Sequence, residues 1–186
     1  MISILNNALK RNANRKTMLA FLGVFLFLAL VIFPVGKSRL EASSGGNGPI
    51  DLLISYTPEK AYSMIESYGD TGRSEYRTFS MTADFVFPLV SAVFFGLLLS
   101  WLFQRGVSPA SKLQMLNILP FGACLFDWLE NLNIIIMLTL YPIRLNAIAE
   151  LASLCTSIKW GFNGVSFAAL FLGVALALKN RIREPA

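Results

Sequence analysis

Residues 82–103, TADFVFPLVSAVFFGLLLSWLF, contain one charged side chain, Asp84, and are otherwise made of apolar and small residues. An apolar stretch of about 20 residues has the length of an α-helix that crosses a lipid bilayer. The pattern favours a membrane span over the buried core of a soluble protein. It is the second of four such stretches along the chain.

The other predicted spans are residues 17–35, 113–140 and 148–178. The last two exceed the length needed to cross, so we expect them to be tilted or to protrude. Charged residues make up 15% of the 186-residue chain, against about 25% in soluble domains. The sequence therefore predicts an all-α fold, with residues 1–186 forming a single integral membrane four-helix bundle.

Lysine and arginine are concentrated before span 1, between spans 2 and 3, and after span 4. By the positive-inside rule, both termini are then cytoplasmic and the loop of residues 36–81 lies on the other side of the membrane. A cleaved signal peptide is the alternative interpretation of span 1. Its apolar run of about 19 residues is longer than the usual 7–15, which favours a retained anchor. The basic residues are Lys10, Arg11, Arg15, Lys16, Arg105, Lys112, Lys179, Arg181 and Arg183.

The loop of residues 36–81 contains a helix start signal. Thr57 can cap a helix, Pro58 fits its first position, and Glu59 supplies an acid in the first turn. We expect a short extracytoplasmic helix over residues 58–68 that stops at Gly69. A second helix is expected to begin near Gly72 and to continue into span 2.

Polar side chains recur at helical spacing inside spans 3 and 4. Residues three or four positions apart share one face of a helix. Asp127 and Glu130 lie at such positions in span 3, and Lys159 lies in span 4 at a similar depth of about 15 Å from the outer ends. The short connection makes these spans an antiparallel hairpin, so the acids and the lysine can meet. Asn131, Thr156, Asn163 and Ser166 lie on the same two faces.

Two interpretations of this polar group remain open. A charge at the centre of a bilayer is costly unless it is paired. Two acids against one lysine leave a spare carboxyl, which favours a ligand-binding pocket between spans 2, 3 and 4. The competing interpretation is a structural contact that fixes the register of the hairpin. The predicted ligand-binding residues are Asp84, Asp127, Glu130, Asn131, Lys159 and Asn163.

A second polar cluster precedes span 2. Arg73, Tyr76 and Arg77 could form a gate over the pocket, with Asp84 below it. The same residue types commonly anchor a helix at the membrane interface, and that interpretation is also open.

Several kinds of chemistry lack their residues in this sequence. The chain has no histidine, which excludes zinc and haem sites built on imidazole. Cys124 and Cys155 lie at different depths, so free thiols are expected. No nucleophile or phosphate-loop motif is present, so an enzyme is not favoured and no cofactor is expected. The net charge of +5 is explained by residues at span ends rather than by nucleic-acid binding.

The segment Asp84-Phe85-Val86-Phe87-Pro88, together with the layout of spans 1 and 2 and their long loop, resembles the EXPERA-domain membrane proteins of the emopamil-binding type. The resemblance implies four spans, cytoplasmic termini and an acidic intramembrane pocket for sterols and cationic amphiphiles. The isomerase members use histidine, which is absent here, so the resemblance does not extend to isomerase activity.

The predicted function is that of a multi-pass membrane protein whose polar pocket binds a lipid or a small amphiphile. Expected partners are membrane lipids, a small apolar or cationic ligand, and further copies of the chain or a larger membrane complex. An accessory subunit of such a complex is the first alternative. A proton-coupled carrier is the second alternative. It ranks last because four spans would have to oligomerise to form a path for protons.

Overall fold

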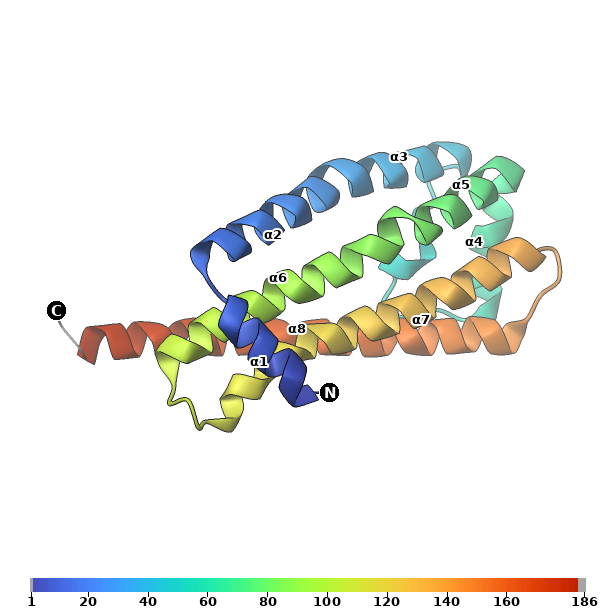
Figure 1. Cartoon of the computed structure of the whole chain (residues 1–186). Helices are drawn as coiled ribbons and strands as arrows, with labels where there is room; N and C mark the ends of the chain where they lie inside the picture. Colours follow the sequence, from blue (N-terminus) through green and yellow to red (C-terminus); the bar gives the residue numbers. More distant parts are fainter. Residues whose placement is uncertain (1, 184–186) are drawn as a thin grey trace. The chain divides into compact units, whose positions relative to one another are not determined.

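The computed structural model describes residues 2–183, and every regular element in that range is a helix (Figure 1). Four helical stretches in it are long and apolar enough to cross a membrane, by length and composition. Each contains one of the four predicted spans, so the prediction of an all-helical chain with four long apolar helices is confirmed. The stretches are Arg15–Ser43, Gly69–Gly106, Lys112–Leu140 and Asn146–Ile182.

The first long stretch is assembled from three helical pieces. The short helix α1 (Ile2–Asn12) precedes it. Then α2 (Arg15–Phe27), the π-helical turn η1 (Leu28–Ile32) and α3 (Phe33–Ser43) follow without a gap. The π-helical turn ends two residues before Pro34, which has no N–H to donate. The helix therefore continues past the predicted end at residue 35 and reaches residue 43.

The predicted short helix in the first loop is present as α4 (Pro58–Ser67). The Thr57 side chain accepts a hydrogen bond from the backbone N–H of Lys60 at 3.3 Å, as a helix cap does. Gly69, with a φ of +62°, begins the next helix in a conformation that favours glycine.

That next helix, α5 (Gly69–Met81), starts three residues before the expected Gly72. It does not run continuously into α6 (Ala83–Gly106), because Thr82 interrupts it with φ −119° and ψ −92°.

The two remaining stretches are simpler. The 3₁₀-helix η3 (Lys112–Ile118) leads into α7 (Leu119–Leu140), and α8 (Asn146–Arg183) is a single helix. A second 3₁₀ turn, η2 (Ile50–Leu52), lies in the otherwise irregular segment between α3 and α4.

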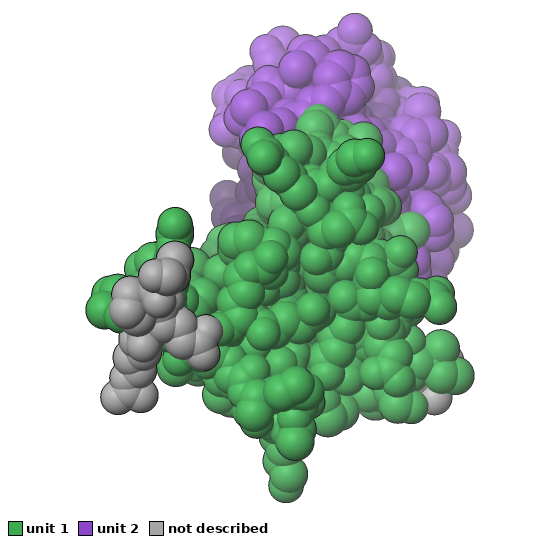
Figure 2. Space-filling model, turned by 60° about the vertical axis from the view of Figure 1, so that its left-hand side comes forward, with its two compact units in different colours: residues 1–25, 89–124, 161–186 green, residues 26–88, 125–160 purple. Residues whose placement is uncertain are grey.

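The chain divides into two compact units, coloured separately in Figure 2. Unit 1 comprises residues 1–25, 89–124 and 161–186, and unit 2 comprises residues 26–88 and 125–160. Helices α2, α6, α7 and α8 contribute residues to both units.

The core of unit 1 is made of aliphatic residues and phenylalanine. Its buried centre is formed by Leu99, Phe103 and Ala169. A Cβ atom on Gly106 would lie only 2.8 Å from the Cβ of Leu176, so the end of α6 approaches α8 at a point where glycine is needed.

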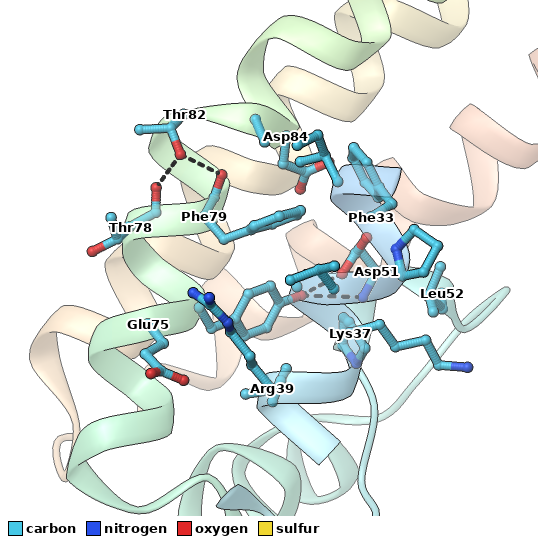
Figure 3. A pocket seen from close by; sticks show the side chains of 18 of the residues that line it. Phe33, Lys37, Arg39, Asp51, Leu52, Glu75, Thr78, Phe79, Thr82 and Asp84 are labelled. Carbon is cyan, nitrogen blue, oxygen red and sulfur yellow. Dashed lines mark hydrogen bonds between the residues drawn. The ribbon is translucent and has the colours of Figure 1, made fainter. Parts of the chain in front are cut away.

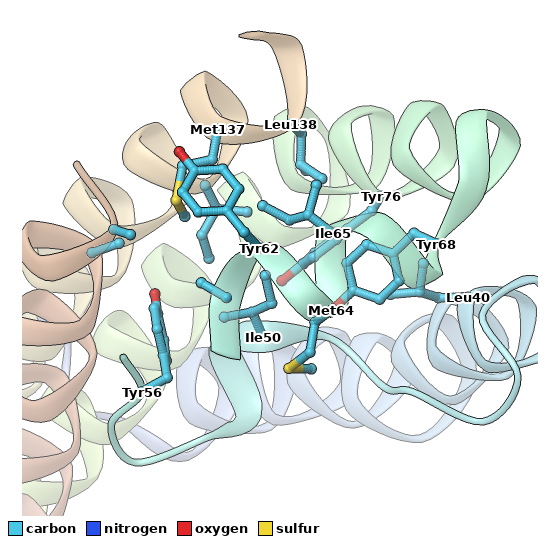
Figure 4. Packing of buried hydrophobic residues seen from close by; sticks show 14 residues of the cluster. Leu40, Ile50, Tyr56, Tyr62, Met64, Ile65, Tyr68, Tyr76, Met137 and Leu138 are labelled. Carbon is cyan, nitrogen blue, oxygen red and sulfur yellow. The ribbon is translucent and has the colours of Figure 1, made fainter. Parts of the chain in front are cut away.

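The core of unit 2 is rich in tyrosine (Figure 4). Tyr62 and Ile65 of α4 are almost fully buried, and they pack in the same cluster as Met137 of α7. The Tyr62 hydroxyl accepts a hydrogen bond from the backbone N–H of Leu145 at 2.6 Å. Helix α4 is therefore packed into the core of unit 2.

Candidate functional site

Lys159 of α8 stands opposite the two acids of α7 in unit 2. Its Nζ lies 2.5 Å from Oε2 of Glu130 and 3.8 Å from Oδ1 of Asp127. The side chain of Glu130 is fully buried and that of Lys159 is 7% exposed, so the pair is shielded from solvent. The predicted meeting of the acidic face with the lysine is thus present, because a short turn after α7 returns the chain antiparallel to it.

Both oxygens of Glu130 have partners. The second oxygen, Oε1, accepts a hydrogen bond from the Thr156 hydroxyl at 2.6 Å. Thr156 lies one turn before Lys159 on the same face of α8 and is fully buried. Glu130 is consequently held by two residues of α8, which is the geometry of a structural contact.

Residues 50–56, which we call the strap, lie along α8 and complete the surroundings of Lys159. The lysine donates a hydrogen bond to the backbone carbonyl oxygen of Asp51 at 3.2 Å. Three further hydrogen bonds tie the strap to serine and tryptophan side chains of α8: Tyr56 N to Ser153 Oγ at 2.9 Å, Ser157 Oγ to Ile54 O at 3.0 Å, and Trp160 Nε1 to Leu53 O at 3.1 Å. Four residues of α8 therefore bind one irregular segment of the first loop.

The strap brings a third acid to the site. The Asp51 carboxylate accepts a hydrogen bond from the Tyr76 hydroxyl of α5, and Asp51 is 8% exposed. Asp51 was not among the predicted site residues. Its signal in the sequence was an acid at the start of the apolar run Ile50-Asp51-Leu52-Leu53-Ile54, but nothing local indicated that the run folds against α8.

Asp84 is the fourth acid, in the first turn of α6. It is 3% exposed, yet no hydrogen bond or ion pair from any residue between 2 and 183 reaches its carboxyl. Its backbone is held by α7: Asn131 Nδ2 donates to the Asp84 carbonyl oxygen at 3.3 Å, and Trp128 Nε1 donates to that of Phe85 at 2.8 Å. The backbone of Asp84 is thus held in place, while its carboxyl group forms no ion pair with Lys159, the base of this site.

A cavity of about 860 Å³ opens beside Asp51 and Asp84 (Figure 3). Its apolar walls come from η1, α3 and α5, and include Ile32, Phe33 and Phe79. Two bases of α3, Lys37 and Arg39, also line the cavity, but their side chains are exposed. Figure 3 shows both carboxyl groups turned toward the interior of the cavity. The cavity therefore combines largely apolar walls with the two buried carboxyl groups of Asp51 and Asp84, which we call its acidic floor.

This cavity is not where the sequence placed a pocket. All of its lining residues lie between positions 29 and 84, so it involves the end of span 1, the strap and the start of span 2. Asp127, Glu130 and Lys159 are not among its lining residues. They lie behind the strap, where Lys159 holds the backbone of Asp51.

The predicted gate residues have separate surroundings. Tyr76 lines the cavity and binds Asp51. Arg73 instead forms an ion pair with Asp70, donates to the carbonyl oxygen of Ile65 at 3.2 Å, and lies 4.3 Å from the centre of the Tyr141 ring. Arg77 is half-buried on α5 and does not line the cavity.

Asn163, the remaining predicted residue, belongs to unit 1, whereas the other predicted site residues all lie in unit 2.

The tyrosines near the strap are neutral in this environment. Burial raises the pKa of Tyr68, and the charge of Asp51 raises it further. Burial likewise raises the pKa of Tyr56, where the nearby carboxylate of Glu130 adds to the effect. These phenols act as hydrogen-bonding groups rather than as charges: the Tyr68 hydroxyl donates to the carbonyl oxygen of Gly48 at 2.9 Å.

The described residues offer neither a metal site nor a disulfide. Within residues 2–183, no group of three or more His, Cys, Asp or Glu side chains is arranged to hold a metal ion. Cys124 and Cys155 are buried and are not joined by a disulfide, as predicted. What the arrangement offers is an acidic, largely buried surface at the base of an apolar cavity.

Comparisons of the chain with the models of known protein families, with characterised proteins and with solved structures gave no match.

Proposed function

We propose that the chain is a multi-pass membrane protein whose cavity in unit 2 binds a lipid or another small amphiphile through a cationic head group. Asp84 is the observation that carries the proposal. A buried carboxyl without a partner is unfavourable unless it is neutralised or meets a ligand. Apolar walls suit a hydrocarbon chain, and the acids at the floor suit a positive charge.

Among the buried charged side chains behind and beside the cavity, the acids outnumber the base. Four carboxyl groups, Asp51, Asp84, Asp127 and Glu130, gather around Lys159. The lysine faces Glu130 and Asp127, which leaves the carboxyl groups of Asp51 and Asp84 at the cavity. A cation in the cavity would relieve the mutual repulsion of these groups.

The membrane topology that we propose follows from length, hydropathy and charge. The four long helices form a bundle that crosses the bilayer, with both ends of the chain in the cytoplasm and α4 on the other side. Lys159 then lies about 20 Å along α8 from Asn146, and the strap reaches the same depth. Irregular backbone at such depth is tolerated where it is buried in protein or lines a hydrated cavity. The strap meets this condition through its hydrogen bonds to α8.

The proposal is tested with a photoreactive dodecylamine and a dodecanol that carries the same diazirine on its chain. The chain is reconstituted into phosphatidylcholine nanodiscs, irradiated, and the labelled residues are located by mass spectrometry. We expect the amine to label the cavity walls in α3 and α5, and unlabelled dodecylamine to compete. A hydrogen bond to a charged group contributes about 1.5–3 kcal/mol, so Asp84→Asn should weaken amine binding about tenfold or more.

Glu75→Gln is the matched control. Glu75 also lines the cavity, but its side chain is exposed, so its removal should change amine binding by less than about threefold. Equal labelling by the amine and the alcohol would show that Asp84 does not recognise the head group. Amine binding by the Asp84→Asn variant as strong as that of the natural chain would show the same. Absence of label from the cavity walls would contradict the proposal that the cavity binds an amphiphile.

A subunit role in a larger membrane complex is the second candidate. It is favoured by the helix of residues 15–43, whose most apolar window contains no residue buried inside the chain. Lipid or the helix of another protein could cover that surface. Purification from the native membrane in mild detergent distinguishes a covering of lipid from one of protein, because a subunit co-migrates with other chains in fixed ratio.

A further inference from the structure

Charge is divided between the two units. Every aspartate and glutamate within residues 2–183 lies in unit 2, and none lies in unit 1. Unit 1 nevertheless carries many bases, and none of its residues between 2 and 183 is an acid that could neutralise them. Its basic residues with described side chains are Lys10, Arg11, Arg15, Lys16, Arg105, Lys112, Lys179 and Arg181.

Hydrogen bonds bring the segments that carry these bases to one end of unit 1. Gln104 Nε2 donates to the carbonyl oxygen of Lys10 at 3.0 Å, which joins the end of α6 to the end of α1. Asn180 Nδ2 donates to the carbonyl oxygens of Arg105 and Gly106, both at 3.1 Å, which joins the end of α8 to the end of α6.

The start of η3 is joined to the same end. Gln114 Nε2 donates to the carbonyl oxygen of Phe103 at 3.1 Å. Asn117 Nδ2 donates to Asn6 of α1 at 2.9 Å and to Ser100 of α6 at 2.8 Å. These buried amides fix η3 against α1 and α6, so Lys112 lies at the same end as Arg105.

The side chains at this basic end are available to a partner. Apart from the half-buried Lys10, all of the eight basic residues are exposed. The guanidinium of Arg105 lies 4.0 Å from the centre of the Trp101 ring, a pairing suited to the boundary between apolar chains and water. Helix α1 has exposed Ile2 and Ile4 at its start and Lys10 and Arg11 in its last turn, and such a mixture of apolar and basic residues suits a helix that lies in the membrane interface.

We infer that the basic end of unit 1 binds the head groups of anionic phospholipids. The inference rests on the membrane insertion proposed above, but not on the amphiphile-binding cavity, which lies in unit 2. Basic clusters at the ends of spans attract acidic lipids, and among the described residues of unit 1 no acid competes for the bases. Several separate helix ends contribute, so the surface fits a layer of head groups better than a single small anion.

The test uses the full chain, first co-floated with phosphatidylcholine vesicles and then extracted in mild detergent. Phosphatidylglycerol and phosphatidylcholine of equal chain length are added together, and native mass spectrometry counts the retained lipids. We expect phosphatidylglycerol to be retained about tenfold over phosphatidylcholine. Raising the salt from about 0.05 M to about 0.5 M should reduce the preference by screening.

Two variants with equal loss of charge locate the site. The pair Arg15→Gln and Lys16→Gln removes two exposed bases of unit 1 and should reduce the preference about tenfold. The pair Lys60→Gln and Arg144→Gln removes two exposed bases of unit 2 and should leave it unchanged. Equal losses in both pairs, no preference in the natural chain, or displacement of the lipid by an equimolar RNA oligonucleotide would each overturn the inference. Failure of the chain to float with vesicles would overturn the membrane proposal itself, and with it this inference.

Discussion

Lys159 is the one lysine or arginine among the buried polar side chains of residues 2–183. It neutralises Glu130 and Asp127, and it holds the backbone of the strap. Each of these contacts depends on the same ammonium group. The residue therefore links the hairpin of α7 and α8 to the floor of the cavity, although it does not line that cavity.

Replacement of Lys159 by methionine should be severely destabilising. Removal of one partner from a buried ion pair leaves an uncompensated charge and costs about 3–5 kcal/mol. Unfolding in mixed detergent micelles, followed by tryptophan fluorescence, measures the loss. The double variant Lys159→Met, Glu130→Leu should recover part of it, and Lys60→Met, at an exposed lysine, should change stability by less than about 0.5 kcal/mol. A Lys159→Met variant as stable as the natural chain would show that the pair contributes nothing.

The burial of Tyr68 leads us to expect that the folded chain loses stability at alkaline pH. Its phenol titrates near pH 10 in the unfolded chain, and burial raises its pKa in the folded one. The folded state therefore holds the proton more tightly, so the stabilisation is complete below about pH 10 and is lost as the pH rises beyond it.

The measurement is the unfolding temperature in detergent from about pH 8 to about pH 12, with phenolate absorbance recorded alongside. We expect the temperature to fall above about pH 10, and phenolate to appear together with unfolding. Tyr68→Phe should lose about 1 kcal/mol at neutral pH, from its hydrogen bond to Gly48, and should show a shallower alkaline decline. An unchanged decline in this variant would assign the effect to other groups.

At the scale of elements, the strap is the part of the first loop that builds the site. It is irregular apart from the single turn η2, and its backbone is bound by side chains of α8 rather than by a neighbouring strand. Such a segment is stable only while these side-chain hydrogen bonds persist. Asp51 is therefore placed at the cavity by residues of a helix that does not itself line the cavity.

Amide hydrogen exchange tests this dependence. The N–H of Tyr56 is bonded to Ser153 Oγ, and we expect it to be protected in the natural chain. The variant Ser153→Ala, Ser157→Ala removes two contacts of the strap, and exchange at Tyr56 should accelerate about fivefold or more, since each bond contributes about 1 kcal/mol. Ser63→Ala, at an exposed serine of α4, is the control. Equal protection in all three proteins would show that the strap is held by its apolar contacts alone.

At the scale of the whole molecule, the topology that we propose has four crossings, so it places both ends of the chain on one side of the membrane. The proposed topology puts Ser3 and Ala110 on the cytoplasmic side and Ser63 on the other, and all three side chains are exposed. Each is replaced in turn by cysteine in a chain whose two buried cysteines are alanine. A membrane-impermeant maleimide applied to oriented vesicles should label Ser3→Cys and Ala110→Cys from one face, and Ser63→Cys from the opposite face. Labelling of Ser3→Cys and Ser63→Cys from the same face would contradict the topology.

The sequence by itself determined the helices and one long-range contact. Four long apolar helices and the capped helix α4 follow from hydropathy and from residues such as Thr57 and Pro58, which act over a single turn. The contact between Glu130 and Lys159 was predictable as well, because helical rise and a short connection fix the depth of residues in a hairpin. The helix irregularities at Thr82 and at the π-helical turn before Pro34 could not be predicted from the sequence. Both depend on how the neighbouring turns pack.

Only the tertiary structure decided where the cavity lies and which acids face it. The strap is bound to α8 by hydrogen bonds between residues about 100 positions apart, for example Lys159 to Asp51. No periodicity along the chain encodes such contacts, because they depend on how a loop returns to a distant helix. For the same reason the sequence could propose Asp84 as a site residue but could not show that its carboxyl is buried without a partner. The physical difference is one of range: hydropathy and capping act within a helix, whereas the cavity exists only once distant segments have packed.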